Sequence, residues 1–181
     1  MLVRHGEAAS GWGEDPDPGL SELGRSQAGE AADDLAPLGP LALVTSPLRR
    51  CRDTAAPLEA RWGVTARVEP GVGEIVAPAS AVGPDARRAW VRAAFAGRWS
   101  DLGAEHLTWR AAVLAALRSL QHDTVVVTHF VAINVAVGEA TGDDRVVSFA
   151  PSNASRTFLR LDRHGQLGVV RLGGTGTTQV L

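Results

Sequence analysis

Three short apolar runs, each followed at once by polar residues, constrain the fold of this chain more than any other feature. The runs are Leu2-Val3, Leu41 to Thr45 and Thr124 to Thr128. Three consecutive valines in the last run strongly favour a buried β-strand. Strands of this kind belong at the centre of a sheet whose two faces are both covered.

Helical patterns occupy most of the chain between and after these runs. Ser21 suits the N-cap of a helix that continues to about Ala36, where Pro37 stops it, and Ser46-Pro47 suits the N-cap and first turn of a second helix. Further helices are predicted at 85–96, 107–120 and 132–140. Alternating strands and helices predict an α/β fold, here a three-layer α/β/α sandwich with a mostly parallel central sheet. We expect a single domain over residues 1–181.

Two further predictions concern the last quarter of the chain. The segments 157–161 and 167–172 flank Asp162-Arg163-His164-Gly165, which predicts a β-hairpin at the edge of the sheet. Gly173, Gly174 and Gly176 predict a loosely held tail.

Charged and polar side chains gather where the three apolar runs end. Arg4-His5-Gly6 follows the first run, Ser46 to Arg50 the second, and His129-Phe130 the third. In an open α/β sheet, ligands bind beyond the carboxyl ends of the strands, so these segments are expected to converge. Two histidines and at least two arginines in one place call for an anionic ligand, and the expected partner is a small phosphorylated molecule.

The residue types predict a covalent phosphoryl transfer. A neutral imidazole can attack phosphorus, while a carboxylic acid protonates the leaving oxygen and later deprotonates water. Glu74 is the best candidate for this acid, because the neighbouring Ile75-Val76 can raise its pKa. Spacing alone leaves three other carboxylates open: Glu7, Glu69 and Glu105. No zinc-like spacing and no P-loop is present, so we expect neither a metal nor a cofactor.

Four segments together resemble the histidine phosphatase superfamily, which includes the phosphoglycerate mutases. They are residues 2–7, 20–28, 46–55 and 126–129, and they occur in the family's order. The triplet Arg4-His5-Gly6 alone is a weak signal, but four ordered segments are a strong one. The helical pattern does not choose between Arg49 and Arg50 as a phosphate ligand, whereas the family motif selects Arg50. The resemblance implies His5 as nucleophile, Arg4 and Arg50 as phosphate ligands, Glu74 as proton donor and His129 as the second pocket histidine.

The chain also departs from the family pattern. Ser10-Gly11-Trp12 stands where mutases usually carry an asparagine, and Phe130 stands where many relatives have glycine. Trp12 is expected near the mouth of the site, and Phe130 is expected to narrow it. Because the chain is shorter than typical mutases, the phosphatase branch is favoured by analogy. Mutase-like transfer, dephosphorylation of protein phosphohistidine and non-catalytic binding of phosphate ligands remain alternatives.

Composition excludes several other classes of function. Lysines and arginines number 18 against 20 acidic residues, so the chain lacks the basic surface of a nucleic-acid binder. It has no apolar run of membrane-spanning length and no signal-peptide pattern at its start. The single cysteine, Cys51, reads as a helix-packing residue and excludes an internal disulfide, so we expect a cytoplasmic protein. The oligomeric state is left open, and His106, His122 and His164 carry no functional expectation.

Overall fold

A mixed sheet forms the centre of the computed structural model, which describes residues 1–10 and 15–176. Within these residues the sheet has six strands in the order β3-β2-β4-β1-β5-β6. The first four run parallel, and β5 and β6 form an antiparallel hairpin at one edge, as the sequence predicted. The strands are β1 (Leu2–Arg4), β2 (Ala42–Thr45), β3 (Arg67–Val68), β4 (Thr124–Thr128), β5 (Arg156–Leu161) and β6 (Leu167–Arg171).

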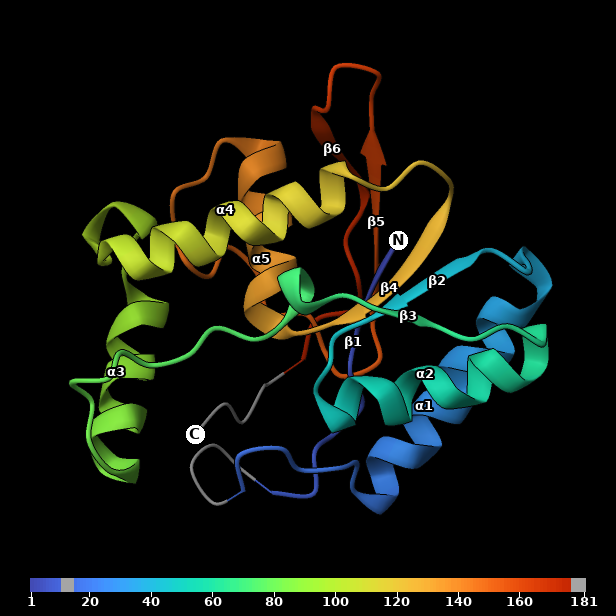
Figure 1. Cartoon of the computed structure of the whole chain (residues 1–181), viewed down its shortest axis with the longest axis horizontal. Helices are drawn as coiled ribbons and strands as arrows, with labels where there is room; N and C mark the ends of the chain where they lie inside the picture. Colours follow the sequence, from blue (N-terminus) through green and yellow to red (C-terminus); the bar gives the residue numbers. More distant parts are fainter. Residues whose placement is uncertain (11–14, 177–181) are drawn as a thin grey trace.

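Helices cover the two faces of the sheet, which confirms the predicted three-layer α/β/α sandwich (Figure 1). On one face lie α1 (Glu22–Leu35) and α2 (Arg49–Trp62), and on the other lie α4 (Ala104–Arg118) and α5 (Phe130–Thr141). The remaining helix, α3 (Pro84–Ala96), stands farther from the sheet, and short 3-10 turns occupy Ala36–Leu38, Pro70–Val72 and Trp99–Asp101. Within the described ranges, no helix has both the length and the apolar character needed to cross a membrane.

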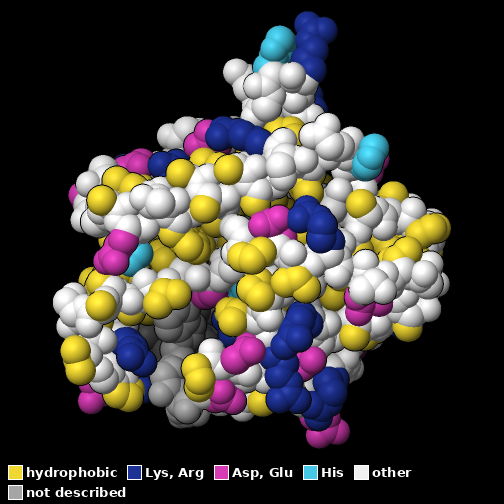
Figure 2. All heavy atoms as spheres, in the orientation of Figure 1, with side chains coloured by type: hydrophobic (Ala, Val, Ile, Leu, Met, Phe, Trp, Pro, Cys, Tyr) yellow, Lys and Arg dark blue, Asp and Glu magenta, His cyan; other side chains and the backbone are white. Residues whose placement is uncertain are grey.

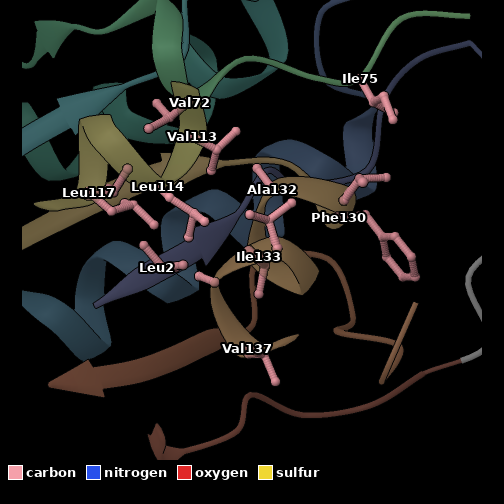
Figure 3. Packing of buried hydrophobic residues seen from close by; sticks show 14 of the residues in the cluster. Leu2, Val72, Ile75, Val113, Leu114, Leu117, Phe130, Ala132, Ile133 and Val137 are labelled. Atoms are coloured by element: carbon pink, nitrogen blue, oxygen red, sulfur yellow. The ribbon is translucent and has the colours of Figure 1, made fainter. Parts of the chain in front are cut away.

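The central strand β4 shows how the sequence produces two cores. All five of its residues are buried. Alternate side chains point to opposite faces of the sheet, and helices cover both faces. Val126 packs with residues of α4 and α5, whereas Val125 and Val127 pack with residues of α1 and α2. Figure 3 shows the first cluster, in which Leu2 of β1 lies near Leu114 and Leu117 of α4. The unbroken apolar run in the sequence is therefore explained by helices on both sides.

Three predicted local features are corrected. Ser46 is not the N-cap of α2: the helix begins at Arg49 after Leu48, and the Arg49 N–H donates to Asp17 Oδ1 over 2.7 Å. Two other helices begin earlier than predicted, α4 at residue 104 and α5 at residue 130. The tail is not loose as far as Gly176, because Gly174 O accepts a hydrogen bond from the backbone of Ser152.

Two glycines allow the loop after β1 to lie directly on the first turn of α1. A Cβ added to Gly24 would stand 2.0 Å from the carbonyl oxygen of Glu7, and one added to Gly6 would stand 2.5 Å from Gly24 O. Neither distance is tolerable for a real carbon atom, so backbone would have to move. Ser21 adds the predicted cap, since its Oγ accepts from the Gly24 N–H over 2.9 Å. This contact fixes the loop that follows His5.

A stability prediction follows from this contact. We expect Gly24→Ala to lower the free energy of unfolding by at least about 2 kcal/mol, because the methyl group overlaps backbone. Gly29→Ala is the matched control in the same helix, where an added Cβ meets nothing within 4 Å. It should raise stability by about 0.5–1 kcal/mol, since alanine is the better helix former. Denaturant unfolding of both variants checks this, and a loss at position 29 equal to that at position 24 would contradict it.

Candidate active site

The register between β1 and β4 brings His5 and His129 together. Arg4 is paired with Thr128 in the parallel ladder, so the residue after each strand lies at the same edge of the sheet. The backbone N–H of His5 donates to Thr128 O over 3.0 Å. The two imidazole rings are 5.2 Å apart between centroids, in an edge-to-face arrangement. The predicted convergence of the strand ends therefore holds for both histidines.

The His5 imidazole is held with one nitrogen available for chemistry. Its Nδ1 lies 2.7 Å from the carbonyl oxygen of Gly6, which only accepts, so Nδ1 carries the proton. Its Nε2 therefore has a lone pair, which accepts from Arg50 Nε over 3.3 Å. Burial first, and then the positive charge of Arg50, lower the pKa of His5 to about 3. At neutral pH this ring is an uncharged base whose Nε2 faces a guanidinium.

Two buried arginines supply the positive charge of the site. Arg4 exposes 7% of its surface and Arg50 exposes 8%. Arg4 donates from Nη1 to Pro151 O over 2.8 Å, and its guanidinium lies 5.1 Å from the centre of the Phe130 ring. Burial lowers the pKa of Arg4 to about 10, which still leaves it charged at neutral pH. By contrast, Arg49 is exposed, so the structure places Arg50 and not Arg49 in the site.

Glu74 lies beside the second histidine. One carboxyl oxygen, Oε2, is 3.7 Å from His129 Nδ1, and the other accepts from the backbone N–H of Ile75 over 2.9 Å. Burial raises the pKa of Glu74 to about 7, and the nearby charges of Arg50 and Arg4 oppose this rise. A carboxyl group with a pKa near neutrality can give a proton and take one back.

The other three carboxylates that spacing left open have different surroundings. Glu69 pairs with Arg67 over 2.6 Å, and Glu7 accepts from the Ser21 hydroxyl over 2.7 Å. The Glu105 side chain is 62% exposed. Of the four candidates, only Glu74 is buried beside His129.

His129 is the most enclosed member of the site. It is fully buried, with Nε2 2.7 Å from the Ser46 hydroxyl and 3.4 Å from the sulfur of Cys51. Burial, together with the charges of its neighbours, lowers the pKa of His129 well below its usual value. The ring is therefore neutral here and offers one N–H. Cys51 is itself fully buried, and burial raises the pKa of its thiol, which agrees with the predicted packing role.

The wall of the site contains the phenylalanine that departs from the family pattern. The Phe130 ring stacks on Phe95 of α3, with 5.5 Å between ring centres, and packs against the Arg4 guanidinium. In Figure 3, Phe130 and Ile75 lie at one end of the apolar cluster. Trp12, expected near the mouth, lies outside the described residues. Within residues 1–10 and 15–176, no three His, Cys, Asp or Glu side chains form a group suited to a metal ion.

Comparison with known families agrees with this geometry. A family model for the histidine phosphatase superfamily (branch 1) matches residues 1–172. The chain belongs to this superfamily. It is 32% identical over 145 residues, 71% of each chain, to an uncharacterized protein of Mycobacterium tuberculosis. It is 36% identical over 118 residues to the glucosyl-3-phosphoglycerate phosphatase of the same species. This match covers 58% of this chain and about half (52%) of that protein.

Two solved structures of phosphatases have the same fold as this chain. The native mycobacterial glucosyl-3-phosphoglycerate phosphatase superposes with a TM-score of 0.72 at 23% identity, covering 97% of this chain and 98% of that one. A phosphoserine phosphatase from Entamoeba histolytica superposes with a TM-score of 0.73 at 18% identity, covering 99% and 98%. The predicted fold class and family are confirmed, and so is the expectation of a phosphatase.

Sequence reasoning missed three polar residues that contact members of the candidate site. The Thr54 hydroxyl accepts from the Gly6 N–H over 2.9 Å, and Asn153 Nδ2 donates to His5 O over 3.1 Å. Ser46, taken as a helix cap, instead contacts His129. Thr54 lies within a family segment and could have been noticed, whereas nothing in the sequence around Asn153 signals its contact with residue 5.

Proposed function

We propose that this protein hydrolyses phosphate monoesters of small molecules through a phosphohistidine intermediate on His5, without a metal. The observation that carries the proposal is the neutral His5 ring, whose Nε2 lone pair faces Arg50 among buried charged side chains. Two guanidinium charges balance a phosphate dianion when Glu74 is protonated. The bound dianion would favour that protonated state further, because a negative neighbour raises the pKa of a carboxyl group.

The reaction has two steps in this proposal. His5 Nε2 attacks phosphorus, the bond from phosphorus to the ester oxygen breaks, and Glu74 gives its proton to the leaving oxygen. Glu74 then takes a proton from water, whose oxygen bonds to phosphorus while the P–N bond breaks and phosphate leaves. Arg4 and Arg50 hold the equatorial oxygens throughout, and His129 contributes its ring N–H to the same group.

The substrate class is part of the proposal. Relatives named for glucosyl-3-phosphoglycerate and phosphoserine support a small phosphorylated molecule over a macromolecule. Acidic and basic side chains are interspersed over the face shown in Figure 2, and the net charge is −2, which does not favour nucleic acid. We assign this activity to a single domain, residues 1–181. We place it in the cytoplasm, since a chain with one cysteine and no internal disulfide suits a reducing compartment.

Trapping of the intermediate tests the proposal. Rapid denaturation during turnover of a ³²P-labelled phosphate ester should give a protein-bound phosphate that is stable in base and released by acid. Turnover should persist in excess EDTA and be inhibited by vanadate, which can occupy the place of the transferring group. Labelled protein with acid-stable phosphate, or activity abolished by EDTA and restored by a metal ion, would overturn the mechanism. Release of free phosphate from a panel of phosphorylated metabolites identifies the substrate.

A further inference from the structure

The segment that carries Glu74 has no helix or strand of its own. It runs from the 3-10 turn Pro70–Val72 to the start of α3 at Pro84. A carboxyl group on such a segment keeps its position only through side-chain packing and hydrogen bonds to the neighbouring backbone. The contacts on either side of Glu74 therefore decide where its proton is delivered.

On the amino-terminal side, the segment is attached to β4. The Thr128 hydroxyl donates to Val72 O over 2.7 Å, which joins the segment to the residue before His129. Val72 and Ile75 are both buried in the core between the sheet, α4 and α5. These contacts hold the chain up to and just beyond Glu74.

On the carboxyl-terminal side, the attachment is a histidine. Nε2 of His106, in the first turn of α4, lies 3.0 Å from Val76 O. A carbonyl oxygen only accepts, so Nε2 carries a proton and donates it, whether or not the ring is charged. His106 is 5% exposed although Val76 is 73% exposed, so the imidazole reaches out from a buried position to a backbone that otherwise faces solvent. Among the described residues, no other hydrogen bond reaches the backbone of Val76 or Ala77.

The His106 ring is itself fixed by its neighbours. It stacks on Trp90 of α3, with 4.7 Å between ring centres and 28° between planes. Its Nδ1 is buried and accepts or donates no hydrogen bond among the described residues, and the exposed Glu105 carboxylate lies 3.8 Å from it. The stack on Trp90 and the burial of His106 restrict rotation of the ring, so the bond to Val76 O is pre-organised.

We propose that His106 is a positioning residue for the phosphatase reaction, because its hydrogen bond to Val76 O holds the Glu74 carboxyl beside His129. This inference rests on the proposed role of Glu74 as general acid and base. Loss of the bond would release the chain two residues from Glu74 and admit water to a carboxyl group whose proton affinity depends on burial. Protonation of the leaving oxygen would then suffer more than attack by His5.

Two variants separate the hydrogen bond from the aromatic stack. His106→Phe keeps a ring on Trp90 but removes the donor, whereas His106→Gln keeps an N–H donor and loses the stack. His164→Phe is the matched control, because His164 is exposed in the hairpin turn at the end of the sheet opposite His5. Thermal unfolding checks that each variant is folded. If His106→Phe does not fold, His106→Asn replaces it, because its amide is too short to reach Val76 O.

The readout is kcat/KM on two substrates that differ in their need for an acid. An alkyl phosphate such as glycerol phosphate has a poor leaving group and needs protonation, whereas p-nitrophenyl phosphate has a good one and needs little. His106→Phe should reduce alkyl turnover by about 10-fold and aryl turnover by no more than about 2-fold. The alkyl loss is smaller than the roughly 10²–10⁴-fold that a general acid contributes, because Glu74 is displaced and not removed. The upper limb of its pH profile should also move to lower pH. His106→Gln should recover most alkyl turnover, and His164→Phe should leave both substrates unchanged.

Equal losses on both substrates, or no loss on either, would overturn the inference. The inference would also be overturned if His106→Gln lost alkyl turnover as strongly and as selectively as His106→Phe. The stack on Trp90, and not the hydrogen bond to Val76 O, would then be responsible. Glu74→Gln assayed in parallel separates this from failure of the proposed function. If that variant shows no preference for the good leaving group, the role of Glu74 itself is wrong; if it does and His106→Phe does not, only the positioning role is wrong.

Discussion

Replacing His5 with alanine should reduce kcat/KM for any phosphate ester by at least about 10⁴-fold, the scale seen when a covalent nucleophile is removed. The reason is the geometry of the ring, whose Nε2 is unprotonated, faces Arg50 and has a pKa lowered to about 3. Alanine leaves Arg4 and Arg50 to bind phosphate but offers no atom to attack it. Phosphate release from p-nitrophenyl phosphate measures the effect.

The matched control for this experiment is His122→Ala, since His122 is exposed and distant from the strand ends that carry the site. It should retain full activity. Phosphate or vanadate should still protect His5→Ala against thermal unfolding, because ligand binding to the native state raises Tm. Turnover by His5→Ala within about 10-fold of wild type would show that another group attacks phosphorus.

The location of this site in the fold could be predicted from the sequence, because it depends on where the strands end. The runs Leu2-Val3 and Thr124 to Thr128 identify two strands, and parallel strands place the residues that follow them at one edge. The antiparallel hairpin likewise follows from a turn sequence between two strand-like segments. Such features depend on local periodicity and on a few general rules of sheet topology.

The contacts that hold the site together could not be predicted in the same way. Asn153 reaches the carbonyl of His5, and His106 reaches the carbonyl of Val76, across sequence separations of 148 and 30 residues. No periodic pattern links residues so far apart when one of them lies in an irregular loop. The Ser46 error has a similar origin: a serine before proline is a good helix cap, but its hydroxyl has a closer partner in His129, which only the tertiary fold brings near.

The second large effect is expected when the proton on Glu74 is removed from the reaction. Glu74→Gln keeps the shape of the side chain and an oxygen to accept from the Ile75 N–H, but cannot give a proton to a leaving oxygen. We expect turnover of an alkyl phosphate to fall by about 10²–10³-fold, and turnover of p-nitrophenyl phosphate to fall by less than about 10-fold. Equal losses on the two substrates would contradict the role of this carboxyl group as the acid.

The pH dependence gives an independent check on the same carboxyl group. Its pKa is raised by burial to about 7, so it is protonated below that pH and loses its proton above it. For the wild type, kcat/KM on an alkyl phosphate should therefore decline above about pH 7, while Glu74→Gln should lack that decline.

The free energy of unfolding should also depend on pH through the ionisation of Glu74. Because the pKa in the folded state exceeds the ordinary value of 4.5, the native protein loses stability as pH rises through about 7. Glutamine cannot ionise, so Glu74→Gln should gain in Tm relative to wild type between mildly acidic and mildly alkaline pH, and a constant difference across that range would show that this carboxyl group is not the one that titrates.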